Sequence, residues 1–258
     1  HYRVFSSVYG PGRIWERFRT ATPAIREYAA SIATRLEGPG DAEIAVLSDE
    51  TMLAYGGPEL NAALLAYFLG AVRGGLSEPE ALSADVVLTI REQGSYMQSF
   101  FAYVYTLQRE RYRDFDAFVE AGLADPRAGV FGYLHYDDVL DFLTATLPPF
   151  VRVRVVPYEL LAARGAAAFV EAFLGEGSAV AASRVDESLG GTMVNRSEDG
   201  YPLRDLARPR RRLRGRSNPQ QAALSEEQRE RVRALYAGGN RALAARLGLE
   251  LGSLGYAL

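Results

Sequence analysis

The chain has 258 residues, of which 48% are hydrophobic and 24% charged, a composition that predicts a single globular domain with a sizeable core. The net charge of −3 gives no electrostatic case for nucleic-acid binding. The absence of cysteine excludes disulfide bonds and thiolate metal sites, and two histidines argue against a histidine metal cluster. No apolar run approaches the ~18 residues of a membrane-spanning helix, and no signal peptide is evident, so we expect a cytoplasmic protein.

Apolar residues at helical spacing predict helices, and short apolar, β-branched runs predict buried strands. Residues 1–12 are expected to be irregular, because they end at the breaker Gly10-Pro11-Gly12. In chain order, the expected elements are helices at 15–18 and 25–36, a strand at 43–47, a helix at 58–73, a strand at 86–90, helices at 94–109, 116–123 and 136–147, a strand at 151–156, and helices at 159–174, 225–237 and 240–247.

The alternation of strands and helices predicts an α/β fold with a parallel sheet covered by helices. After residue 178 the chain becomes polar and carries an arginine-rich run at 208–216. We expect residues 218–258 to be the helical C-terminal part of the same domain, with a break between its two helices at Gly238-Gly239.

The stretch 86–99 is the strongest candidate for a binding site. Its strand ends at Arg91, a turn carrying Gly94 follows, and the next helix carries Ser99. Open α/β sheets build sites at the carboxyl ends of their strands, and an arginine, a serine and helix N-terminal N–H groups can all bind a phosphate. The alternative is a surface arginine that pairs with Glu92 and a serine that faces neighbouring helices. We expect Tyr96, Phe100 and Tyr103, at helical spacing, to be core residues.

Three features occur in an order that resembles a known family. They are the strand that ends at Arg91 with Ser99 eight positions later, the strand at 151–156 that leads to Tyr158-Glu159, and a tail. The tail contains Val194-Asn195-Arg196-Ser197, then Asn240, Leu243, Ala244, Leu247, Gly248 and Gly255-Tyr256. In this order and over roughly residues 43–256, the chain is similar to PAPS-dependent sulfotransferases, especially their bacterial and carbohydrate-type members.

The resemblance implies a fold of the P-loop nucleotide-binding type and transfer of a sulfuryl group from PAPS to a hydroxyl or amine, which leaves PAP. The acceptor would be a small molecule or a carbohydrate. Arg91 and Ser99 would bind the 3′-phosphate of the donor. Arg214-Gly215 loosely resembles a late basic loop that closes over the donor. The alternatives for this arginine run are an anionic acceptor site and a solvated loop.

One part of the family pattern has no match. The family's 5′-phosphosulfate loop usually contains a lysine, whereas all 29 basic residues here are arginine. The chain starts at His1, and we expect the missing strand and loop to precede it in a longer protein. The alternative is a non-catalytic binding protein with a degenerate sulfotransferase-like fold.

The resemblance also implies a catalytic base after an early strand, and Glu50 matches that place best. Asp49 is the neighbouring substitute, or a group that orients the acceptor. The alternative is that these acidic residues cap a helix. His135 is a further candidate base, but it precedes a helix and is expected to be structural, with Asp137 and Asp138 in the first helical turn.

Overall fold

The computed structural model describes residues 2–6, 22–38, 44–48, 57–103, 105, 110–175, 201–202 and 221–258. The chain divides into two compact units, one of residues 1–86 and 127–154 and the other of residues 87–126 and 155–258. Each unit is described by itself.

The described residues form an α/β protein in which helices predominate and the strands pair two by two. Strand β1 (Tyr2–Ser6) pairs in parallel with β2 (Ile44–Ser48), with Tyr2 opposite Ile44 and Ser6 opposite Ser48. The expectation that residues 1–12 are irregular is therefore wrong for residues 2–6. The run at 2–6 lies before the breaker at 10–12, and its tyrosine, valine and phenylalanine all have high β-propensity.

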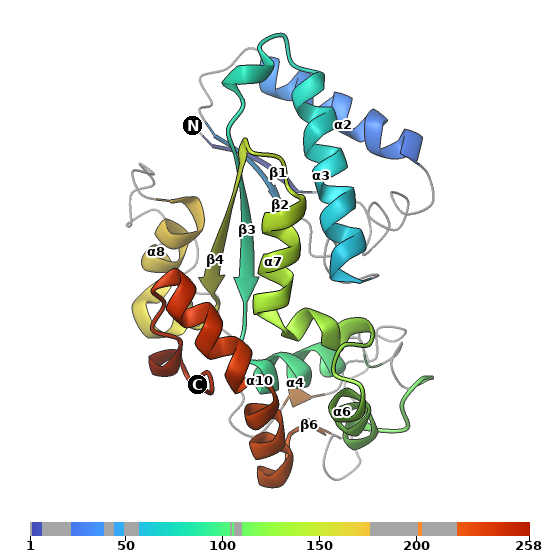
Figure 1. Ribbon diagram of the computed structural model, residues 1–258, viewed down its shortest axis with the longest axis vertical. Coiled ribbons are helices and arrows are strands. Elements are labelled where there is room, and N and C mark those ends of the chain that lie inside the picture. Colours follow the sequence, from blue (N-terminus) through green and yellow to red (C-terminus); the bar gives the residue numbers. More distant parts are fainter. Residues whose placement is uncertain are drawn as a thin grey trace. The chain divides into compact units, whose positions relative to one another are not determined.

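The predicted strands at 86–90 and 151–156 are confirmed as β3 (Ala84–Ile90) and β4 (Val151–Pro157), which form a second two-stranded sheet. The N–H of Ala84 donates to the carbonyl of Phe150 at 3.2 Å, and the N–H of Tyr158 donates to the carbonyl of Ile90 at 2.8 Å. The start of β3 is thus bonded beside the start of β4, and the end of β3 beside the end of β4. The two strands are therefore parallel, and their arrows point the same way in Figure 1. Among the described residues, β2 is paired with β1 and not with this sheet, so the expected single parallel sheet appears only as separate parallel pairs.

The first unit is built on three helices that match the sequence prediction. They are α2 (Thr22–Glu37), α3 (Pro58–Gly74) and α7 (Tyr136–Thr146), and α3 packs against both of the others (Figure 1). Pro58 occupies the start of α3 as expected, since its missing N–H costs nothing there. Short 3₁₀ helices lie at Pro79–Ala81 and Gly129–Leu134. The buried core of this unit includes Ile25, Ala29, Ile32, Leu65, Phe68, Val72, Leu134, Val139 and Leu143.

The second unit contains α4 (Gln93–Tyr103) together with the remaining elements. They are α6 (Phe115–Ala124), α8 (Glu159–Leu174), the antiparallel pair β5 (Tyr201–Pro202) and β6 (Gln221–Ala222), α10 (Glu226–Leu247) and a 3₁₀ helix at Leu251–Leu254. Helix α4 contacts α6, α10, β5 and β6. Its buried face consists of Gln93, Gly94, Met97, Gln98, Phe101 and Ala102, and Phe101 packs against Phe115 and Phe118 with ring centroids 5.4 and 5.2 Å apart.

Helix α10 runs unbroken from Glu226 to Leu247, so the predicted break at Gly238-Gly239 is wrong. Glycine inside a helix costs about 1 kcal/mol relative to alanine, and tertiary contacts on both sides outweigh that cost. Val232 and Tyr236 precede the glycines, Asn240 and Leu243 follow them, and all four are buried. The helix ends at Gly248, whose φ of 65° is the left-handed conformation that glycine adopts readily.

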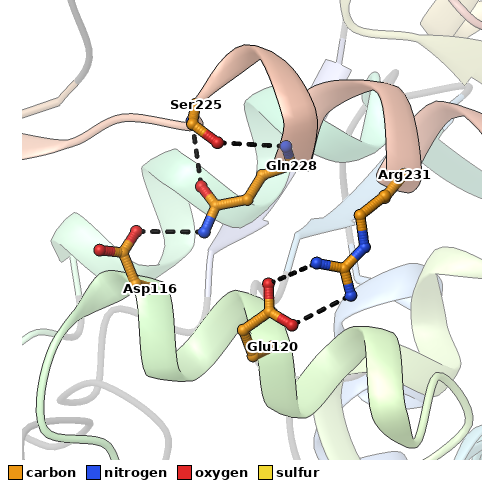
Figure 2. A network of polar contacts seen from close by, with 5 residues as sticks. All are labelled: Asp116, Glu120, Ser225, Gln228 and Arg231. Carbon is orange, nitrogen blue, oxygen red and sulfur yellow. Dashed lines mark hydrogen bonds and ion pairs between the residues drawn. The ribbon is translucent and has the colours of Figure 1, made fainter.

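Polar side chains fasten the start of α10 to α6, as Figure 2 shows. The Ser225 hydroxyl accepts from the Gln228 N–H, and the Gln228 side chain accepts from the Ser225 N–H, which forms a capping box. Gln228 also donates to Asp116 at 3.1 Å. Arg231 donates to both oxygens of Glu120, at 2.8 and 3.0 Å. The two helices are therefore joined by side-chain hydrogen bonds.

Candidate functional site

The candidate site lies in the second unit, where β3 ends and α4 begins. Arg91 follows the last residue of β3, and its guanidinium donates from Nη1 to Ser99 Oγ at 3.0 Å. The same guanidinium lies over the ring of Tyr158, 5.1 Å from the ring centroid. The structure therefore brings Arg91 and Ser99 together, as the sequence predicted, and adds an aromatic face that can favour the guanidinium charge.

The hydroxyl of Ser99 both accepts and donates in this arrangement. It accepts from Arg91 and donates to the backbone carbonyl of Tyr96 at 3.1 Å. An anion at Arg91 would draw the hydroxyl hydrogen away from that carbonyl, because a charged acceptor forms the stronger hydrogen bond. The planar guanidinium, with five N–H donors, suits phosphate or sulfate oxygens.

The N-terminus of α4 differs from the sequence expectation. Two of its backbone N–H groups, those of Gly94 and Ser95, donate to the two carboxylate oxygens of Glu92 at 3.0 and 2.7 Å. The protein's own carboxylate thus occupies N–H groups that we expected to contribute to a phosphate site. An anion bound at this turn would rely on side chains, first of all on Arg91.

Glu159, the first residue of α8, connects the turn to the tail of the chain. One carboxylate oxygen accepts from the backbone N–H of Glu92 at 2.9 Å, and the other accepts from the Tyr256 hydroxyl at 2.7 Å. Tyr256 is only 3% exposed. Both contacts join Glu159 to the protein itself.

A pair of buried side-chain amides makes a second connection between the turn and the tail. Gln93 donates to Asn240 Oδ1 at 2.8 Å, and Asn240 donates back to Gln93 Oε1 at 3.2 Å. Asn240 also donates to the backbone carbonyl of Ala257 at 3.0 Å. The sequence contains Asn240 as part of the family-like tail but gives no signal that it pairs with Gln93, 147 residues away.

The aromatic residues of α4 are less buried than predicted. Tyr96 and Phe100 are half-buried and stack with ring centroids 5.7 Å apart, whereas Tyr103 is 48% exposed. The core expectation is thus wrong for Tyr103, because the buried face of α4 is the one that carries Met97 and Phe101. Burial raises the pKa of the Tyr96 phenol to about 12.

Four of the residues predicted for the site lie outside the described residues: Asp49, Glu50, Arg214 and Gly215. The same holds for the segments 194–197 and 208–216. The roles of these residues stay predictions.

His135 belongs to the first unit and directly precedes α7, as expected. Its backbone carbonyl accepts the N–H of Val139 at 3.0 Å, which closes the first helical turn. Asp137 and Asp138 lie in that turn, and Asp138 forms an ion pair with Arg127. This placement agrees with a structural histidine at a helix start.

Within the part of the chain that the structure describes, no group of three or more histidine or acidic residues is placed to hold a metal ion. Over the same residues, no helix is both long enough and apolar enough to cross a membrane.

No family model, curated protein or solved structure matches the chain. The functional assignment therefore depends on the residues at the end of β3 and on the order of the motifs around them.

Proposed function

We propose that this protein is a PAPS-dependent sulfotransferase that moves a sulfuryl group to a hydroxyl or amine of a small-molecule or carbohydrate acceptor. The observation that carries the proposal is the Arg91–Ser99 hydrogen bond of 3.0 Å at the carboxyl end of a parallel strand. This is where open α/β sheets bind their ligands, and a guanidinium beside a hydroxyl suits the dianionic 3′-phosphate of PAPS.

The proposed reaction asks for little covalent chemistry from the protein. An acceptor oxygen or nitrogen attacks sulfur, a new bond to sulfur forms, and the bond from sulfur to the bridging oxygen breaks, so that PAP leaves with the electron pair. Glu50 would take the acceptor proton, with Asp49 as its substitute or as an orienting group. Positioning of donor and acceptor and stabilisation of the departing charge would supply most of the rate enhancement.

The side chains at the turn carry more negative than positive charge, which is unfavourable for an anionic donor. Arg91 brings one positive charge to the turn, while Glu92 and Glu159, which both hydrogen-bond within it, bring two negative charges. A donor with several phosphate and sulfate charges would need additional cations. Arg214, in the arginine-rich run 208–216, is our candidate for one of them.

Turnover is the direct test of the enzyme. The purified full-length protein is incubated with PAPS and a panel of sugar, phenol and amine acceptors, and PAP release is followed by chromatography. We expect acceptor-dependent PAP release. Glu50→Gln should lose at least about 100-fold in turnover, the usual contribution of a general base, while PAP affinity in calorimetry stays within twofold. Asp49→Asn is the matched control and should lose less.

The same two measurements separate the enzyme from the non-catalytic alternative. Tight PAP binding without release of PAP from PAPS, for every acceptor of the panel, would favour a binding protein. If the protein shows no PAP binding and no turnover, the sulfotransferase assignment is rejected altogether.

A further inference from the structure

The turn that presents Arg91 is held by side chains from two distant parts of the chain. Residues 92 and 93 follow Arg91 directly, and each is bound through a different group. Glu159 accepts from the backbone N–H of Glu92, and Asn240 exchanges two hydrogen bonds with the side chain of Gln93. We name Glu159, Tyr256, Gln93 and Asn240 the polar clamp.

Three of the four residues of the polar clamp are buried, and Glu159 is half-buried. Gln93, Asn240 and Tyr256 are 3%, 2% and 3% exposed. Buried hydrogen bonds of this kind are costly to break singly, because the partner that stays behind cannot find water. The buried Gln93–Asn240 pair is therefore suited to hold one geometry of the turn, and the half-buried Glu159 adds a second contact to it.

We propose that the polar clamp positions Arg91 for its anionic ligand, with Glu159 and Asn240 as positioning residues that do not touch that ligand. The proposal rests on the proposed function, because the ligand in question is the 3′-phosphate of PAPS. Glu159 fixes the backbone one residue after Arg91, and its other oxygen is itself fixed by Tyr256. Asn240 fixes the following residue, and the tail carbonyl of Ala257 fixes Asn240. Movement of the tail would then loosen the guanidinium.

Two substitutions of Glu159 separate positioning from charge. Glu159→Gln and Glu159→Leu remove the same negative charge, but only glutamine keeps an oxygen acceptor for the Glu92 N–H and an N–H₂ group for the Tyr256 hydroxyl. We expect Glu159→Leu to bind PAP about 5- to 10-fold more weakly than Glu159→Gln, as one to two net hydrogen bonds would give. Tyr256→Phe removes only the hydroxyl and keeps the charge of Glu159, so it is compared with wild type and should bind PAP about 2- to 10-fold more weakly, as one net hydrogen bond would give.

The matched control lies on the same helix as Asn240. Arg231→Gln breaks the bidentate pair with Glu120 between α10 and α6 without touching residues 91–95, and Figure 2 shows that pair. We expect its PAP affinity to stay within twofold of wild type. A loss as large as that of Tyr256→Phe would mean that general loosening of α10 is responsible, and would overturn the proposal.

A second readout needs no ligand. In ¹⁵N relaxation measurements, the Nε–Hε group of Arg91 should be well ordered in wild type and in Glu159→Gln, and more mobile in Glu159→Leu and Tyr256→Phe. If Arg91 is ordered in wild type and in Glu159→Gln but mobile in Glu159→Leu, and wild type does not bind PAP, the proposed function fails and only the effect of the polar clamp on the order of Arg91 is supported. If PAP binds wild type and both Glu159 variants equally, and Arg91 order is the same in all three folded proteins, the clamp proposal is wrong and the proposed function stands.

Discussion

Arg91 and Ser99, eight residues apart in sequence, are joined by a hydrogen bond of 3.0 Å between the guanidinium and the serine hydroxyl. A strand end places the first residue and the second turn of a helix places the other, so the contact depends on how β3, the turn and α4 follow one another. Such a pair presents a cation and a hydroxyl on one side of the turn. It is the feature on which the anion site depends.

Removal of the Ser99 hydroxyl should weaken anion binding moderately. Ser99→Ala keeps the helix and Arg91 but deletes one hydrogen-bond partner, so we expect PAP affinity to fall about fivefold, which corresponds to ~1 kcal/mol. Isothermal titration calorimetry measures the change. Ser95→Ala is the matched control in the same helix, because the Ser95 contact to Glu92 uses a backbone N–H that alanine retains. Equal losses in both variants would argue against a role for the Ser99 hydroxyl.

Stability of the first unit should depend on pH through Asp85. Its carboxylate accepts two hydrogen bonds of 2.9 Å from Arg152 and lies 2.9 Å from Arg154. The hydrogen bonds from Arg152 hold the pKa of Asp85 below its ordinary value, burial opposes this, and the charge of Arg154 adds to the lowering. A depressed carboxyl pKa stabilises the folded protein above the unfolded pKa of about 3.9 and loses this effect as the pH falls through the folded pKa.

Asp85→Asn should therefore lower the free energy of unfolding by about 1 kcal/mol near pH 7, at the upper end for a partly exposed pair. Urea unfolding at pH 7, 5 and 3 measures the difference from wild type. We expect that difference to be constant from pH 7 to 5 and to shrink at pH 3. A difference that grows on acidification would contradict the assignment.

The capping box of α10 should contribute measurably to the stability of the second unit. Ser225→Ala removes the acceptor of the Gln228 N–H and should cost about 1 kcal/mol in urea unfolding, as is usual for an N-cap serine. Ser225→Asp keeps an acceptor at the same place and next to the helix N-terminus, so it should stay close to wild type. If alanine and aspartate are equally destabilising, the capping contact is not what stabilises the helix start.

Local periodicity predicted most of the helices and three of the strands, because apolar residues recur in them at helical or strand spacing. The predicted helix at 58–73 is α3 at 58–74, and the predicted strand at 151–156 is β4 at 151–157. Local residue propensity gave a wrong prediction where contacts with residues distant in sequence determine the structure. Glycines predicted a break in α10, but the helix continues because Tyr236 and Asn240 on either side of them are buried in contacts outside the helix.

Sequence reasoning also brought Arg91 and Ser99 together, since a strand end and a helix start are local features. It could not find the partners of the turn. Glu92 takes the N–H groups at the start of α4, and a carboxylate that caps its own helix resembles any surface glutamate in sequence. Glu159–Tyr256 and Gln93–Asn240 join residues 97 and 147 positions apart, and only the tertiary fold brings such residues into contact.

The most direct test of the central claim, that Arg91 binds a 3′-phosphate, compares two ligands on three proteins. Calorimetry measures the affinity of wild type and of Arg91→Ala for PAP and for adenosine 5′-monophosphate, which lacks the 3′-phosphate. Arg229→Ala, another loss of one positive charge in the second unit, is the control. We predict that wild type and Arg229→Ala prefer PAP by at least about 10-fold, as a charge-assisted contact of ~1.5–3 kcal/mol would give, and that Arg91→Ala loses this preference. An undiminished preference for PAP in Arg91→Ala would contradict the account.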